Sequence, residues 1–160
     1  YYTTDYDLSN HYEEGFSVIE KYEPEKVWSA VFFDAEQQFY YLKRFRFENV
    51  VRHTLFIGET EGSYLVVLSG EKRPRFEVVF GGRYESRPAE VIVADEFIAE
   101  KSYKARGKRV TTYEVKQINE IEPLDSGEEE SEDTTSTDID FEITNPDMLS
   151  DEAQMKLDFE

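Results

Sequence analysis

The sequence contains no cysteine, only two histidines and no long apolar segment. Without cysteine the chain can form no disulfide, no thiolate metal site and no cysteine nucleophile, which suits a reducing cytoplasm. No stretch approaches the roughly 20 apolar residues that span a bilayer, and residues 1–4 lack the features of a signal peptide. We therefore expect a soluble protein with no metal site and no membrane segment.

Motifs of catalysis are missing as well. The chain has no nucleophile elbow, no phosphate-binding loop, no dinucleotide-binding glycine motif and no zinc-protease motif. His11 and His53 lie in polar surroundings that are typical of surface residues, and no carboxylate lies in the apolar setting of a general acid or base. We expect neither a catalytic residue nor a cofactor in this chain.

Aromatic residues are abundant, with 12 Phe, 11 Tyr and 1 Trp against 5 Pro and 8 Gly. This composition is typical of a packed β-rich protein, since disordered chains are poor in aromatic residues. Short aromatic or β-branched runs alternate with turn residues, and helical periodicity is weak. We predict an all-β body of antiparallel meanders, with a hairpin connection at 34–37 and strands near 16–22, 27–33, 38–47, 54–58, 63–69, 75–80, 89–93, 109–116 and 117–122.

The charge is divided unevenly between two parts of the chain. Residues 1–124 hold 17 Lys and Arg against 22 Asp and Glu, whereas residues 125–160 hold 1 against 14. At Asp125 the composition changes to Ser, Gly, Thr, Asp and Glu, which is typical of solvated, unfolded sequence. We predict one folded domain over 1–124 and an acidic, largely flexible tail over 125–160.

Two basic clusters lie in the body. The first is in the strand predicted at 38–47, where alternation predicts an aromatic core face and a basic face on the other side. The aromatic face would carry Phe39, Tyr41, Phe45 and Phe47, and the basic face Tyr40, Leu42, Arg44 and Arg46. The second cluster places five cations in the nine residues 101–109, which also contain one glycine that lets the backbone approach a partner. Such a loop suits phosphate oxygens.

The candidate phosphate-binding residues come from these two clusters, from the turn before the strand at 75–80 and from the start of that strand. They are Lys43, Arg44, Arg46, Arg73, Arg75, Lys101, Lys104, Arg106, Lys108 and Arg109. The alternative is that these cations only balance the charge of a very acidic protein on a solvated face.

The same residues match a known family. The run 97–113, with Glu120–Leu124 after it, resembles the last blades of the C-terminal domain of bacterial topoisomerase IV and gyrase A subunits. Tyr40–Phe45 and Glu77–Gly82 fit the same family. The resemblance covers most of residues 1–124 and is greatest to the topoisomerase IV A subunit.

The resemblance implies a β-pinwheel, a propeller-like ring of four-stranded blades whose basic rim binds and bends duplex DNA. This chain has room for about two blades, so the resemblance implies a partial ring. The pattern Arg-Phe-Glu-x-Val at 46–50 and 75–79 agrees with repeated blades. Gyrase A subunits also carry a Gly- and Arg-rich wrapping box, of which Lys104–Lys108 is at most a degenerate relative. Its absence favours simple DNA capture over wrapping.

The resemblance further implies partners and a setting. The chain would be a fragment of an ATP-dependent type II DNA topoisomerase, and its start without Met agrees with a fragment. It would work with duplex DNA, the rest of the A subunit and the ATPase B subunit, near the nucleoid in the cytoplasm. The catalytic tyrosine of the family lies in an upstream domain, so none of the 11 tyrosines here has that role.

Two other functions stay open: a protein-interaction module whose basic face meets an acidic protein, and a β-domain whose aromatic residues bind carbohydrate. The acidic tail would either keep the protein soluble or compete with DNA for the basic face. At its end, the spacing of Gln154, Leu157 and Phe159 is similar to the motif with which bacterial replication proteins enter the groove of the sliding clamp. The alternative for this segment is an amphipathic end that packs on the body.

Overall fold

The computed structural model describes residues 1–5 and 14–124, and its regular secondary structure is almost entirely β. Within these residues, helix is limited to α1 (Ala94–Phe97) and the 3-10 turn η1 (Gly82–Tyr84). The prediction of an all-β fold is confirmed. None of the helical segments in the two described ranges has the length and apolar character needed to cross a membrane.

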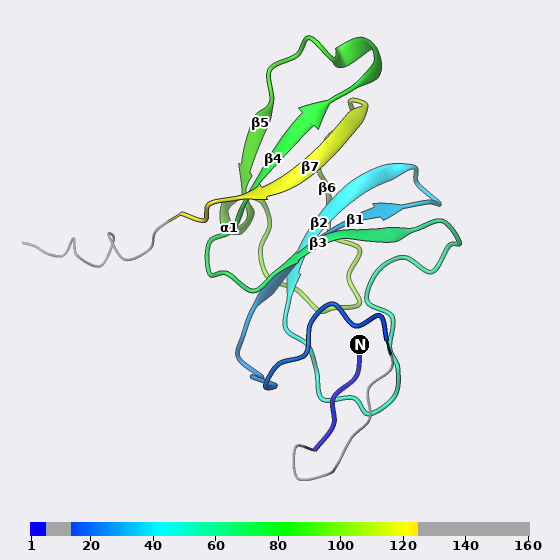
Figure 1. Ribbon diagram of the computed structural model, residues 1–160, viewed down its shortest axis with the longest axis vertical. Helices are drawn as coiled ribbons and strands as arrows, with labels where there is room; N and C mark the ends of the chain where they lie inside the picture. The colour runs from blue at the N-terminus through cyan, green and yellow to red at the C-terminus, as the bar shows by residue number, and fades with distance from the viewer. Residues whose placement is uncertain (6–13, 125–160) are drawn as a thin grey trace, which may run out of the picture. The chain divides into compact units, whose positions relative to one another are not determined.

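The strands form a larger and a smaller antiparallel sheet (Figure 1). The larger sheet has the order β3-β1-β2-β6, and the smaller sheet has the order β5-β4-β7. The bounds are β1 Trp28–Asp34, β2 Phe39–Phe45, β3 Tyr64–Ser69, β4 Arg75–Phe80, β5 Glu90–Val93, β6 Lys108–Arg109 and β7 Val115–Ile121. Along the chain, β4 and β5 belong to the smaller sheet, β6 belongs to the larger sheet and β7 belongs to the smaller sheet again. The chain path therefore ties the two sheets together.

A tight hairpin joins β1 and β2, and Asp34 stabilises it. A carboxylate oxygen of Asp34 accepts the backbone N–H of Glu36 at 2.9 Å, and its backbone carbonyl accepts the N–H of Gln38 at 2.7 Å. Gln38 closes the turn in the left-handed conformation, with φ of 61°. The hairpin predicted at 34–37 is confirmed.

The main core lies between the two sheets. β4 alternates between half-buried and buried residues, as expected of a strand with one face toward a core. The inter-sheet core consists of Val31, Leu42, Phe76, Val78, Phe80, Ala94 and Ile118. Burial of this apolar surface is what holds the sheets against each other.

A second core, which we call the outer core, covers the opposite face of the larger sheet. It consists of Trp28, Ala30, Phe45 and Tyr103, with Tyr1, Phe47, Phe56 and Leu68 packed against them. Tyr1 and Thr54 exchange two backbone hydrogen bonds of 2.7 Å, and the Tyr1 ring lies 4.3 Å from that of Phe47. The centre of the larger sheet is thus covered on both faces, which explains why β1 is buried at nearly every position.

The basic face predicted for the strand at 38–47 is wrong. The alternation is as predicted, but Leu42 is fully buried in the inter-sheet core and Tyr40 packs against it. The smaller sheet covers this face, so β2 has no broad solvated side.

Three predicted strands also differ from the structure. Residues 16–22 and 54–58 belong to no strand, although Phe56 places its ring in the outer core from an irregular segment. The strand predicted at 109–116 is interrupted by a turn, in which Thr111 Oγ1 accepts the N–H of Tyr113 at 3.2 Å. The interruption occurs because the chain changes sheets between β6 and β7.

The repeated pattern Arg-Phe-Glu-x-Val does not mark equivalent positions. Residues 75–79 lie in β4, whereas 46–50 follow β2 outside any strand. The pinwheel arrangement and the number of blades stay predictions. Residues 1–124 form one compact unit. His11, the acidic tail and its proposed docking residues Gln154, Leu157 and Phe159 lie outside the described residues.

We expect Leu42→Ala to lower the free energy of unfolding by about 2–5 kcal/mol, because it leaves a cavity between the sheets. Leu55→Ala is the matched control, since Leu55 is 56% exposed and Leu42 is 0% exposed. The control should change the free energy by less than about 0.5 kcal/mol. Urea unfolding of the full chain measures both, and equal losses would contradict the arrangement of the two cores.

Candidate nucleic-acid interface

Five exposed cations lie on and just before β6, one of the two edge strands of the larger sheet. They are Lys101, Lys104, Arg106, Lys108 and Arg109, and we call them the basic strip. Within residues 1–5 and 14–124, none of the five forms an ion pair. No carboxylate among the described residues neutralises these five charges.

The first part of the basic strip lies on residues 101–107, which we call the basic loop. The loop begins beside Arg44 of β2, where the Lys101 N–H donates to the Arg44 carbonyl at 2.8 Å. It ends beside Leu42, two residues earlier in β2, where Lys108 pairs with Leu42. Gly107 permits this close return, because its φ is 95° and a Cβ there would lie 2.6 Å from the Leu42 carbonyl oxygen.

One aromatic ring and one buried ammonium hold the basic loop on the sheet. Tyr103 is only 6% exposed, and its ring meets the Tyr1 ring edge to face at 5.7 Å. The Lys43 Nζ donates to the carbonyl oxygen of Tyr103 at 2.6 Å and to that of Ala105 at 3.1 Å. It also donates to the Phe56 carbonyl. Burial lowers the pKa of Lys43 to about 8, so the ammonium is mostly protonated at pH 7.

Aromatic rings support two cations at the end of the basic strip. The Lys108 ammonium lies 4.3 Å from the centre of the Phe97 ring, and the Arg109 guanidinium lies 4.5 Å from the centre of the Phe39 ring. In these contacts the charged groups themselves lie near the rings, and the Lys108 Nζ also donates to the Phe97 carbonyl at 3.3 Å, while both residues stay exposed. Binding of a partner to Lys108 and Arg109 would therefore cost less side-chain conformational entropy.

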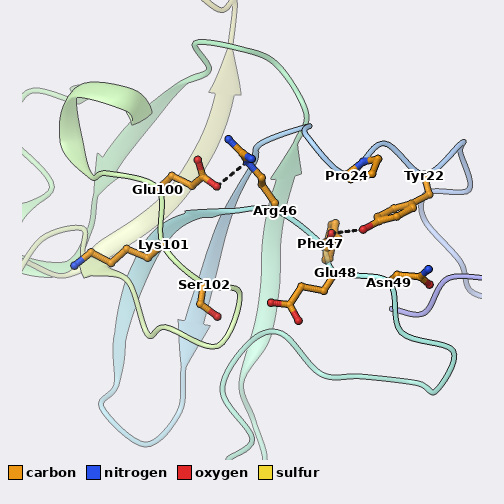
Figure 2. A pocket seen from close by; sticks show the side chains of 9 residues that line it. All are labelled: Tyr22, Pro24, Arg46, Phe47, Glu48, Asn49, Glu100, Lys101 and Ser102. Atoms are coloured by element: carbon orange, nitrogen blue, oxygen red, sulfur yellow. Dashed lines mark hydrogen bonds and ion pairs between the residues drawn. The ribbon is translucent and has the colours of Figure 1, made fainter.

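An open depression of about 440 Å³ lies at the start of the basic loop (Figure 2). It is lined by Tyr22, Pro24, Arg46, Phe47, Glu48, Asn49, Glu100, Lys101 and Ser102. Its charges are mixed, because the Arg46 guanidinium lies 2.8 Å from the Glu100 carboxylate and Glu48 adds a second carboxylate (Figure 2). The depression therefore does not concentrate positive charge as the basic strip does. The described part of the chain contains no group of His, Cys, Asp or Glu that could hold a metal ion.

Comparison with known proteins identifies the family. The family described as topoisomerase C-terminal domain, Bacteroidota, matches residues 1–122. The chain belongs to this family. No curated protein and no solved structure matches it. The predicted membership among topoisomerase C-terminal domains is confirmed, and the assignment to the A subunit of topoisomerase IV or gyrase stays a prediction.

The other cations predicted to bind phosphate in this topoisomerase C-terminal domain are engaged within the fold. Arg46 forms ion pairs of 2.8 Å with Glu25 and Glu100, and Arg73 forms ion pairs of 3.0 Å with Asp95 and Glu96 of α1. Arg44 and Arg75 donate to backbone carbonyls at 3.2 and 2.7 Å. Lys43 is buried beneath the basic loop. Half of the predicted residues thus form the basic strip, and the other half hold segments together.

The sequence contained a signal for the burial of Lys43 but not for the ion pairs. Alternation along β2 places Lys43 on the same face as Tyr41 and Phe45, which were predicted to face the core. The ion-pair partners of Arg46 and Arg73 lie at least 21 residues away along the chain, at distances that no local pattern predicts.

We expect Gly107→Ala to destabilise this topoisomerase C-terminal domain more than Gly15→Ala does. Both glycines have a left-handed φ, of 95° and 104°, so either substitution strains the backbone by about 1–3 kcal/mol. Only at Gly107 would the new methyl group also collide with the Leu42 carbonyl, whereas Gly15 has open space around it. Urea unfolding of the two variants measures the difference. A larger loss for Gly15→Ala would contradict the close approach of the basic loop to β2.

Proposed function

We propose that this topoisomerase C-terminal domain binds duplex DNA through the basic strip, without sequence preference, and so positions a DNA segment for the enzyme. The observation that carries the proposal is the basic strip itself, whose five exposed cations lie on an anchored segment and form no ion pair within the described residues. Family membership supports it, because a topoisomerase acts on DNA.

Phosphate contacts would dominate this binding. Cations on a loop and a short edge strand suit the regularly spaced phosphates of a duplex. The only α-helix among the described residues, α1, has four residues and is too short to read base edges along the major groove. Sequence-specific readout is therefore not part of the proposal.

The parent enzyme is proposed to be a type IIA topoisomerase, with this chain in an A subunit similar to that of topoisomerase IV. The support is the resemblance of residues 97–113 and 120–124 to the last blades of such subunits. In this assignment the partners include the rest of the A subunit and the ATP-hydrolysing B subunit, the blades belong to a β-pinwheel and the enzyme acts at the nucleoid. Docking of Gln154, Leu157 and Phe159 to the sliding clamp is a separate proposal that rests on their spacing alone.

Affinity for duplex DNA should fall steeply with salt, because each neutralised phosphate releases counterions. With roughly five phosphate contacts, the logarithm of the binding constant plotted against the logarithm of salt concentration should have a slope of about −4 to −5. Fluorescence anisotropy with the full chain and two unrelated duplexes, between 50 and 200 mM salt, measures this slope. Affinity that ignores salt, or that differs widely between the duplexes, would contradict the proposal. Tighter binding to polyglutamate or to a glycan than to DNA would favour the two rival functions.

The variants Arg106→Ala and Arg46→Ala compare the DNA binding of a cation in the basic strip with that of a cation held in ion pairs. Arg106 forms no ion pair within the described part of the chain, whereas Arg46 binds Glu25 and Glu100. We expect Arg106→Ala to weaken binding to every duplex alike and to reduce the salt slope by about 0.9. Arg46→Ala should leave the slope unchanged. If Arg46→Ala reduced the slope and Arg106→Ala did not, the basic strip would be the wrong surface.

A further inference from the structure

We propose that Lys43 is a positioning residue for DNA binding: its buried ammonium holds the basic loop, and with it Lys104 and Arg106, in the binding arrangement without touching DNA. The inference rests on the function proposed for the basic strip. It assigns to Lys43 a role different from the direct phosphate contact that its place in a basic cluster first predicts.

The hydrogen bonds of Lys43 are complete. An ammonium group has three N–H donors and no acceptor. The Lys43 Nζ donates to three backbone carbonyls, those of Tyr103 at 2.6 Å, Ala105 at 3.1 Å and Phe56. With the residue only 4% exposed, no donor remains for a phosphate oxygen.

The position of Lys43 places its ammonium under the middle of the basic loop. The loop leaves β2 beside Arg44 and returns beside Leu42, so Lys43 is the strand residue between the two ends of the loop. Two of its three acceptors belong to the loop itself. Lys104 and Arg106 each directly follow an acceptor residue and are exposed.

The charge of Lys43 has no carboxylate partner in the described part of the chain. Its Nζ lies 5.5 Å and 5.3 Å from the ring centres of Phe32 and Phe45, and the three carbonyl dipoles face it. Removal of the ammonium would take a donor from all three carbonyls, and at the buried Tyr103 carbonyl the loss of a partner is costly. The loop would relieve that cost by moving into water, and the exposed cations would lose their fixed spacing.

The test compares Lys43→Met with Val78→Ala, which destabilises the inter-sheet core and not the outer core to which Tyr103 of the loop belongs. Both are made in the full chain and measured below their unfolding temperatures. If only about a tenth of the Lys43→Met molecules keep the loop in place, affinity for duplex DNA falls about tenfold. The salt slope should stay that of the wild type, since no phosphate contact is lost. Limited trypsin digestion should cut after Lys104 and Arg106 faster in Lys43→Met than in Val78→Ala.

Lys43→Gln retains two N–H donors and should lose less affinity for DNA than Lys43→Met. If Lys43→Met does not fold, Lys43→Gln takes its place in every comparison. Unchanged DNA affinity in a folded Lys43 variant would overturn the inference. An equal loss of affinity in Val78→Ala would also overturn it, and so would a salt slope reduced by about 0.9, which would mean direct contact with a phosphate. A wild-type chain that does not bind DNA at all would instead overturn the proposed function.

Discussion

Burial of β1 and β2, the central strands of the larger sheet, on both faces is the constraint on which the rest of the structure depends. The smaller sheet covers one face, and the N-terminal residues, the segment around Phe56 and the basic loop cover the other. Because β2 offers no solvated face, its lysine must find partners inside the protein. The ammonium donates to two carbonyls of the basic loop, so these groups keep hydrogen-bond partners where the loop lies on the sheet. The position of the basic strip thus follows from the packing of Tyr103 in the outer core and from the hydrogen bonds of Lys43 to the basic loop.

This arrangement divides the cations of the domain by role. Arg44, Arg46, Arg73 and Arg75 connect segments that are distant in sequence, through ion pairs or backbone carbonyls. Exposed ion pairs of this kind contribute little to stability, but they remove charge that could attract a phosphate. Beside the basic strip, the Glu100 carboxylate is paired with Arg46 and with no cation of the strip. Positive charge therefore remains on one edge of an otherwise acidic protein.

Much of the fold could be predicted from the sequence. Aromatic and β-branched runs predicted β1, β2, β3, β4 and β5 to within one or two residues, and Asp34 marked the hairpin. Prediction failed at residues 54–58 and 109–116, where aromatic or β-branched residues serve packing or a change of sheet instead of strand pairing. Periodicity records which residues are apolar and how they alternate. It does not record which strand or sheet lies opposite.

The sequence by itself determined the all-β class, the family and the cluster of cations at 101–109, because these follow from local composition and spacing. Only the tertiary structure decided which cations are free. Lys43 and Lys104 are both lysines in basic clusters, yet one is buried under three carbonyls and the other is exposed. The difference arises from contacts between residues 60 or more positions apart, such as that of Lys43 with Tyr103, and these depend on how the sheets and loops close around β2.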